Sequence, residues 1–105
     1  MLLLHKLQTM KAYIIVDVTI TDPKLYEDYK KLTPTSLEPF DGKFIVRGGS
    51  SETLEGAWQP GRIVILEFPS SQKAKDWWSS AAYAPAKAIR QSASKTKMIL
   101  LEGVS

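Results

Sequence analysis

The chain has 105 residues, the length of one domain that can bury a useful but modest hydrophobic core. Hydrophobic residues make up 44% of it and charged residues 24%, which excludes a disordered chain, a coiled coil or a collagen-like chain. Lysine and arginine number 14 against 11 acidic residues, but the basic residues are spread along the chain and alternate with acids. We therefore expect a globular protein that does not bind nucleic acid.

The chain contains no cysteine, which excludes disulfides, zinc–thiolate sites, iron–sulfur clusters and cysteine nucleophiles. This composition agrees with a reducing compartment, so we expect a cytoplasmic protein. Residues 1–9 are expected to form a loose N-terminal extension, because Met10 directly precedes the first strand-like run. The apolar run in this extension is too short for a signal peptide or a membrane span. The only histidine, His5, lies there, so we expect no metal and no cofactor, since haem usually needs an axial histidine.

The first part of the chain predicts a strand followed by a helix. Residues 11–20 are rich in β-branched and aromatic side chains and contain neither glycine nor proline, which favours a strand. Asp22 is an N-cap candidate with a proline directly after it, and apolar residues recur at helical spacing over 23–32. Because Pro34 disfavours the helical conformation of the residue before it, residues 33–40 form either a continuation or a second short helix.

The rest of the chain alternates apolar runs with turn residues. In chain order it predicts a strand over 43–48, a polar loop over 50–61, a strand over 62–68, helices over 72–80 and 84–92, and a strand over 97–102. This order is the β-α-β-β-α-β order of the ferredoxin-like fold, an α+β fold with both helices on one face of an antiparallel sheet. We assign residues 10–105 to one such domain. The other face needs a partner, so we expect a homodimer that pairs as a dimeric α/β barrel.

Side chains alternate across a strand, so each predicted strand can be divided into two faces. One face is almost purely apolar and suits a surface under helices; it comprises Ile14, Val16, Val18, Phe44, Val46, Val64, Leu66, Phe68, Ile99 and Leu101. The opposite, mixed face carries aliphatic and charged residues: Tyr13, Ile15, Asp17, Ile45, Arg47, Ile63, Ile65, Glu67, Met98, Leu100 and Glu102. We expect the mixed face to meet a partner or a cavity.

Four charged residues of the mixed face are candidate catalytic residues: Arg47, Glu67, Asp17 and Glu102. In this hypothesis Arg47 keeps one or two acids ionised, while another acid, desolvated and crowded by like charge, has its pKa raised and moves protons. The alternative is structural: Arg47 pairs with Glu67 or Asp17 across a dimer interface, or these groups face water at strand ends.

Five further residues are candidate ligand-binding residues: Tyr13, Trp58, Arg62, Trp78 and Tyr83. Trp58 and Arg62 lie in or beside the loop between the middle strands, where binding residues often occur, although exposed loop side chains without a role are the alternative. Trp78 and Tyr83, with Trp77, suit a pocket for a flat apolar ligand. The helical spacing of Trp77 favours packing in the core or an interface instead.

Several motifs carry a resemblance to a known family. They are Asp22-Pro23 with Tyr26 and Tyr29, Phe44-Ile45-Val46-Arg47-Gly48-Gly49, Leu54-Glu55-Gly56-Ala57-Trp58, residues 62–70, Trp77-Trp78 with Ser80 and Tyr83, and Glu102-Gly103. From Met10 to Val104 the chain resembles the uncharacterised bacterial family called domain of unknown function thirteen-thirty, in the dimeric α/β-barrel superfamily. The resemblance implies the ferredoxin-like half-barrel and the homodimer. The family has no assigned reaction, so no catalytic residue is transferred from it.

Two classes of function remain open. The first is a cofactor-free small-molecule enzyme, such as an isomerase, lyase or monooxygenase, in which a carboxylate moves protons and Arg47 or Arg62 stabilises an enolate or carboxylate. The alternative is a non-enzymatic homodimer that binds a small ligand or has a structural role. Arg90, near a helix end, either binds a carboxylate or complements the helix dipole, and the dipole is favoured. An RNA-recognition module is disfavoured, because residues 62–67 offer aliphatic side chains where bases would need aromatic ones.

Overall fold

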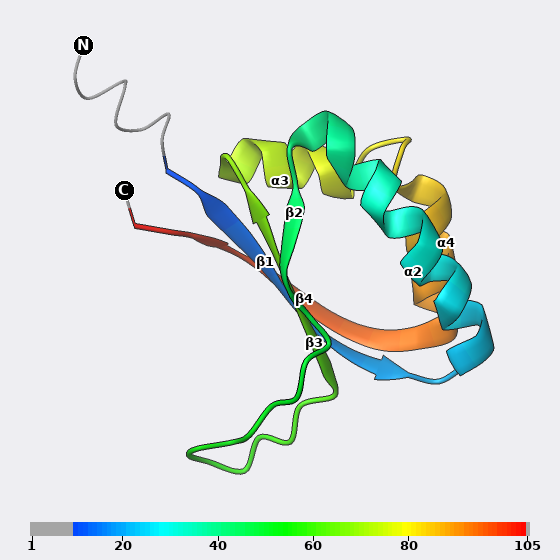
Figure 1. Ribbon diagram of the computed structural model, residues 1–105, viewed down its shortest axis with the longest axis vertical. Helices are drawn as coiled ribbons and strands as arrows, with labels where there is room; N and C mark the ends of the chain where they lie inside the picture. The colour runs from blue at the N-terminus through cyan, green and yellow to red at the C-terminus, as the bar shows by residue number, and fades with distance from the viewer. Residues whose placement is uncertain (1–9, 105) are drawn as a thin grey trace.

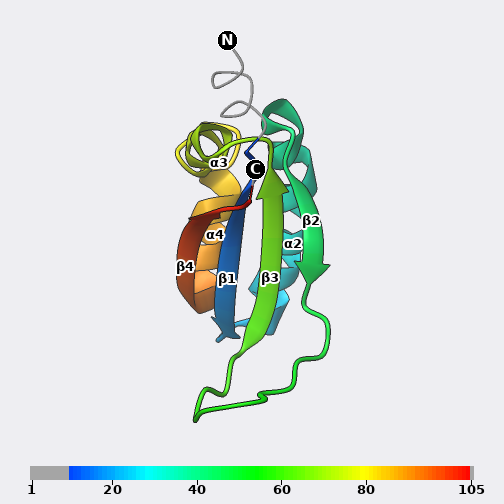
Figure 2. The same ribbon diagram turned by 90° about the vertical axis from the view of Figure 1, so that its left-hand side faces the viewer.

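The structure is a computed structural model that describes residues 10–104 (Figure 1); the predicted extension and its His5 lie outside the described residues. The elements in chain order are β1 (Ala12–Ile20), α2 (Pro23–Leu37), a 3-10 helix η1 (Glu38–Phe40), β2 (Lys43–Arg47), β3 (Arg62–Phe68), α3 (Ser71–Trp78), α4 (Ala84–Ala93) and β4 (Ser94–Glu102). The strands form one antiparallel sheet in the order β2-β3-β1-β4, and the helices cover one of its faces (Figures 1 and 2). The α+β, ferredoxin-like prediction is confirmed.

Helix α2 continues past the predicted end and contains a proline. Its N-terminus is capped as expected, since the Asp22 carboxylate accepts a hydrogen bond from the backbone N–H of Leu25 at 3.1 Å. Pro34 lies inside the helix and has no N–H, so the carbonyl of Lys30, four residues earlier, has no helical donor. This carbonyl accepts a hydrogen bond from Arg47 Nη2 of β2 at 2.8 Å. The proline thus supplies an acceptor that connects α2 to the sheet.

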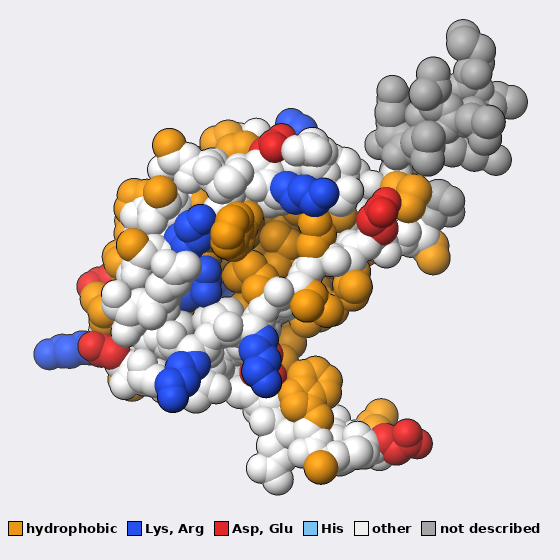
Figure 3. All heavy atoms as spheres, turned by 180° about the vertical axis from the view of Figure 1, so that it is seen from behind, with side chains coloured by type: hydrophobic (Ala, Val, Ile, Leu, Met, Phe, Trp, Pro, Cys, Tyr) orange, Lys and Arg blue, Asp and Glu red, His pale blue; other side chains and the backbone are white. Residues whose placement is uncertain are grey.

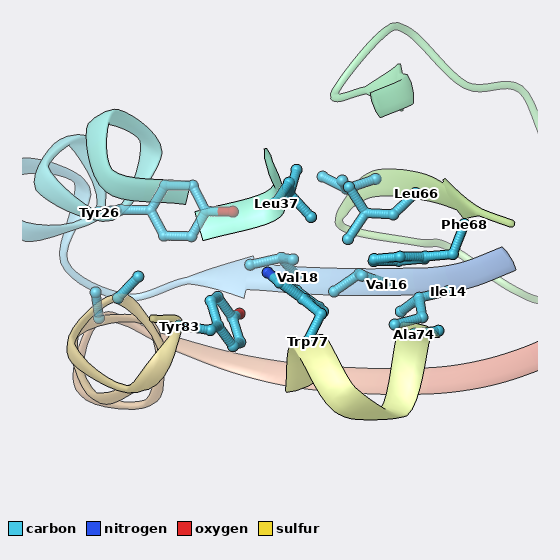
Figure 4. Close-up of a cluster of buried hydrophobic side chains, with 13 residues drawn as sticks. Ile14, Val16, Val18, Tyr26, Leu37, Leu66, Phe68, Ala74, Trp77 and Tyr83 are labelled. Carbon is cyan, nitrogen blue, oxygen red and sulfur yellow. The ribbon is translucent and has the colours of Figure 1, made fainter. Parts of the chain in front are cut away.

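The core lies between the sheet and the helices, with the fully buried Trp77 at its centre (Figure 4). The indole packs against the ring of Tyr83, with ring centroids 3.9 Å apart, and against Phe68, with centroids 5.6 Å apart. Its Nε1 donates a hydrogen bond to Ser36 Oγ of α2 at 3.1 Å. One side chain of α3 therefore contacts α2, β3 and the residue before α4.

The predicted faces are correct for β1 and β3 but wrong for β4. Ile14 pairs with Leu100 and Val16 with Met98, and residues paired across strands lie on the same face of a sheet. Met98 and Leu100 therefore face the helices, while Ile99 and Leu101 lie on the open face. The error has a simple cause, because residues 98–101 are four apolar residues in a row and carry no alternation. Glu102 shifts with them to the helix side.

A bulge in β2 reverses the predicted faces of its second half. Phe44 pairs with Leu66, but Val46 pairs with Ile65, so the register shifts between these two pairs. A shift of one residue moves every following side chain to the other face. Arg47 consequently lies on the helix side and Val46 on the open side, and the prediction that Arg47 shares a face with the acids is wrong.

A double-mutant cycle tests the link between the proline and the sheet. We expect Arg47→Ala to destabilise the native protein by about 0.5–1.5 kcal/mol through the lost hydrogen bond, and by less in a Pro34→Ala background. The reason is that Pro34→Ala supplies a backbone N–H that can satisfy the Lys30 carbonyl. Urea unfolding of the four proteins at one concentration measures the coupling, and strictly additive effects would contradict the account.

Candidate functional site

A small cavity of about 20 Å³ lies between α2 and the sheet. Hydrophobic side chains from the sheet and the core form most of its lining. The lining residues with polar side-chain atoms, Trp77 aside, are Tyr26, Tyr29, Lys30, Thr33, Arg47 and Arg62. Two arginines that the sequence analysis placed on different elements are thus brought to one site.

Arg62 enters the cavity from the first position of β3. It pairs with the buried Val18 of β1, which places its side chain on the helix side of the sheet. Its Nε is buried and has no hydrogen-bond partner among residues 10–104. The guanidinium lies near the face of Tyr26, with Cζ 5.8 Å from the ring centroid. It also packs on Gly48, where a Cβ atom would overlap with the guanidinium.

Arg47 lies at the exposed rim of the cavity and connects β2 with α2. Its guanidinium carbon is 4.1 Å from the centroid of the Phe44 ring, a cation–π contact, while Nη2 donates to the Lys30 carbonyl. The side chain therefore closes the gap between the sheet and the helix.

Tyrosine hydroxyls form a hydrogen-bonded group beside the cavity. The hydroxyls of Tyr29 and Tyr83 are 2.8 Å apart, and the buried Arg90 donates from Nε to Tyr83 at 3.1 Å. Burial and the neighbouring Tyr83 raise the pKa of Tyr29. Burial and Tyr29 also raise the pKa of Tyr26, more than the charges of Arg62 and Arg90 lower it. Tyr26 and Tyr29 are therefore neutral hydrogen-bond donors at neutral pH.

The arginines beneath the helices have no acidic partner among the described residues. The ion pairs found within residues 10–104 all use lysine; they are Lys11–Glu67, Lys30–Glu27, Lys43–Glu67 and Lys73–Asp41. The layer between the sheet and the helices thus has a positive charge that no acid among residues 10–104 pairs.

Glu67 and Tyr13 lie away from this cavity, on the open face of the sheet. They pair across β1 and β3, and Glu67 forms ion pairs with Lys43 at 3.3 Å and Lys11 at 3.6 Å. Burial tends to raise the pKa of Glu67, but the hydrogen bond from Lys43 and the charge of Lys11 lower it overall. Burial and the Glu67 carboxylate raise the pKa of Tyr13. Glu67 is therefore not the acid with a raised pKa that the proton-transfer hypothesis needs.

Asp17 and Trp58 meet at the other end of the open face. The Asp17 carboxylate accepts from Trp58 Nε1 at 3.2 Å and from the backbone N–H of Gly61 at 2.8 Å. These bonds hold the base of the loop 48–61, which projects from the body of the molecule in Figure 1. Asp17 thus has a structural contact, and it does not reach the cavity lining.

Trp78 lines a separate hollow along the β4 edge, which Figure 3 shows as an apolar depression between the helices and the sheet. Lys87 lies over its ring, with Nζ 3.8 Å from the centroid, and donates to the Trp78 carbonyl at 2.9 Å. Glu102 is exposed at the end of β4, outside both hollows. The predicted site residues therefore lie in several different places, and of these residues only Arg47 and Arg62 line the cavity.

Sequence reasoning missed Tyr26, Tyr29 and Thr33 as site residues. A signal was present, because spacings of three and four residues place them on one face of a helix. Arg90 was assigned to the helix dipole, whereas the structure buries it against the Tyr83 hydroxyl. Within residues 10–104 no cluster of three histidine, aspartate or glutamate side chains could hold a metal ion, and no helix is long and apolar enough to span a membrane.

Residues 11–104 match the family described as Domain of unknown function (DUF1330). The chain belongs to this family. A search of curated proteins finds no match.

Solved structures of other proteins share the fold. RPA0582, a protein of unknown function from Rhodopseudomonas palustris, has a TM-score of 0.75 and 19% identity over 92% of this chain and 85% of its own. SnoaB, a cofactor-independent oxygenase from Streptomyces nogalater, has a TM-score of 0.63 and 10% identity over 91% of this chain and 95% of its own. A dimeric ferredoxin-like protein of unknown function from Thermobifida fusca has a TM-score of 0.53 and 14% identity, covering 93% of each chain.

A pair of neighbouring glycines tests the position of Arg62. Gly48 has φ of 71° and no room for a Cβ beside the guanidinium, whereas a Cβ at Gly49 would meet nothing within 4 Å. We expect Gly48→Ala to lower the free energy of unfolding by about 1 kcal/mol or more, and Gly49→Ala to change it much less. Guanidinium chloride unfolding measures both, and equal losses would count against both the left-handed conformation of Gly48 and the packing of Arg62 on it.

Proposed function

We propose that the protein is a cofactor-free small-molecule enzyme with one site per subunit, in the cavity between α2 and the sheet. The observation that carries the proposal is the convergence of Arg47, Arg62 and neutral tyrosine hydroxyls in a cavity with mostly apolar walls. Small-molecule sites typically combine apolar walls with a few polar groups that fix orientation.

The chemistry that fits these groups is stabilisation of a negative charge that develops on a substrate oxygen. Arg62 supplies a fixed positive charge in a partly buried site, and Tyr26 supplies a protonated hydroxyl beside it. Isomerases and lyases that form an enolate have this requirement. SnoaB, described as a cofactor-independent oxygenase, has the same fold, so cofactor-free chemistry is compatible with it.

A second candidate function is a homodimer that binds a small ligand without converting it. One observation favours it: among residues 10–104, no carboxylate and no histidine side chain lines the cavity. The acids predicted to move protons, Asp17 and Glu67, lie on the open face, and Glu102 lies at the end of β4. The enzyme proposal therefore depends on the tyrosine, arginine, lysine and threonine side chains of the described lining.

The homodimer forms through the open face of the sheet in this proposal. No helix of the described residues covers this face, as Figure 2 shows, and it exposes large apolar side chains. Ile99 is 55% exposed and Leu101 44% exposed, and the exposed Trp58 lies beside Asp17. Packing two such faces together removes this apolar area from water. The neighbour from Thermobifida fusca, described as dimeric, supports this arrangement for the fold.

Mass spectrometry tests the enzyme proposal against the binding proposal. Native spectra of freshly purified protein identify any retained compound, which is then incubated with the protein together with a panel of small organic acids. We expect a product to form, and its rate to fall about 100-fold in Arg62→Gln, which removes the charge that stabilises the reacting oxygen. Lys43→Gln on the open face is the matched control and keeps the rate. A retained compound without conversion supports the binding function, and neither retention nor conversion contradicts both.

Two substitutions to glutamate test the dimer. A charge on the open face would be buried without a partner, so we expect Ile99→Glu to give monomers. Leu32→Glu is the matched control, because Leu32 is 46% exposed but lies on α2, and it should leave the dimer intact. Light scattering after size exclusion measures the masses. A monomeric wild type, or a dimer that survives Ile99→Glu, would rule out pairing through this face.

A further inference from the structure

We propose that the cavity between α2 and the sheet binds a carboxylate group, so that the ligand is a small organic acid held by Arg62. This inference rests on the proposed function, because it uses the same cavity, and it adds the chemical class of the ligand.

The first argument is the unsatisfied donor on Arg62. Its Nε is buried and has no hydrogen-bond partner within residues 10–104. A buried donor without a partner costs about 1–3 kcal/mol, and more when it belongs to a charged group. A ligand oxygen at this position removes the cost, and a carboxylate is the acceptor that matches a guanidinium in both charge and planar geometry.

The second argument is the balance of charge around the cavity. Arg47 lies at the rim, Arg62 in the wall, and Arg90 behind the tyrosines, where it is only 5% exposed. None of them takes part in the ion pairs found among the described residues, all of which use lysine. Buried charges are usually paired, so Arg62 in the wall, with Arg47 at the rim and Arg90 behind the tyrosines, favours an anion in the cavity.

The third argument is the size of the cavity. A volume of about 20 Å³ is close to the space that one water molecule needs, so the cavity excludes a tetrahedral phosphate and has room for about one carboxylate oxygen. The remainder of the acid then points to the rim, where the side chain of Arg47 is exposed. Arg47 can exchange its hydrogen bond to the Lys30 carbonyl for one to the ligand.

The tryptophan signals of the protein give a direct test. The chain has three tryptophans, and Trp77 lines the cavity while Trp58 and Trp78 lie outside it. Their indole N–H signals in nitrogen-15 correlation spectra, assigned with Trp58→Phe and Trp78→Phe, are followed during titration with sodium acetate. Acetamide is the neutral compound of the same shape, and sodium chloride keeps the ionic strength constant. We expect acetate, and not acetamide, to shift the Trp77 signal in a saturable way.

Variants locate the binding group. We expect Arg62→Gln to weaken acetate binding about tenfold or more, the loss of a hydrogen bond to a charged group, and Lys43→Gln to leave it unchanged. The Trp58 and Trp78 signals show whether Arg62→Gln is folded, and Arg62→Lys, which keeps the charge but loses the planar fork, should give intermediate affinity.

The outcomes separate the inference from the proposed function. Equal shifts of Trp77 with acetate and acetamide would overturn the carboxylate inference and leave the cavity as a ligand site. No shift of Trp77 with either compound would overturn both the inference and the location of the site. Similar acetate shifts of all three indole signals would indicate a general salt effect and would also overturn the inference.

Discussion

The burial of one indole, that of Trp77, fixes the arrangement on which the rest of the structure depends. Its ring fills the centre of the layer between sheet and helices, and its N–H is satisfied by Ser36 of α2. An indole is rigid and has a single donor, so this bond sets how far α2 stands from α3. The same ring forms part of the cavity wall, so the core and the candidate site share one side chain.

The second constraint is the positive charge of the arginines in the same layer, because charged groups are costly in the apolar surroundings that bury Trp77. An apolar layer favours aliphatic and aromatic side chains, yet the chain places Arg62 and Arg90 in it. Charged groups in such a layer lower stability unless they are paired, and departures of this kind from simple folding rules are typical of functional sites. Neighbouring residues fit these arginines: the Tyr83 hydroxyl accepts a hydrogen bond from Arg90, and Gly48 leaves room for the Arg62 guanidinium where a Cβ atom would overlap with it.

The sequence predicted the elements well and the site only in part, for reasons that can be located. In β1 and β3 an acid inside the apolar run, Asp17 or Glu67, marks the open face, so their faces were predicted correctly. Residues 98–101 are all apolar, so their sequence does not indicate which of them face the helices. The bulge before Val46 could not be predicted either, because no glycine or other typical bulge residue occurs in β2. That single extra residue separates Arg47 from the acids and joins it to Arg62. Tyr26 and Tyr29 were accessible from helical spacing, but the unpaired state of the arginines depends on three-dimensional contacts.

The proline inside α2 separates two properties that usually change together, the strength with which a site holds a ligand and the speed with which the ligand enters. The acceptor that holds Arg47 across the rim exists because Pro34 has no N–H, and Pro34 itself is not part of the cavity lining. In the proposed ligand site, residues of the cavity lining set the affinity, while Pro34, outside it, sets whether Arg47 is held across the rim. A substitution at Pro34 therefore offers a way to change the exchange rate of the proposed ligand without changing the groups that bind it.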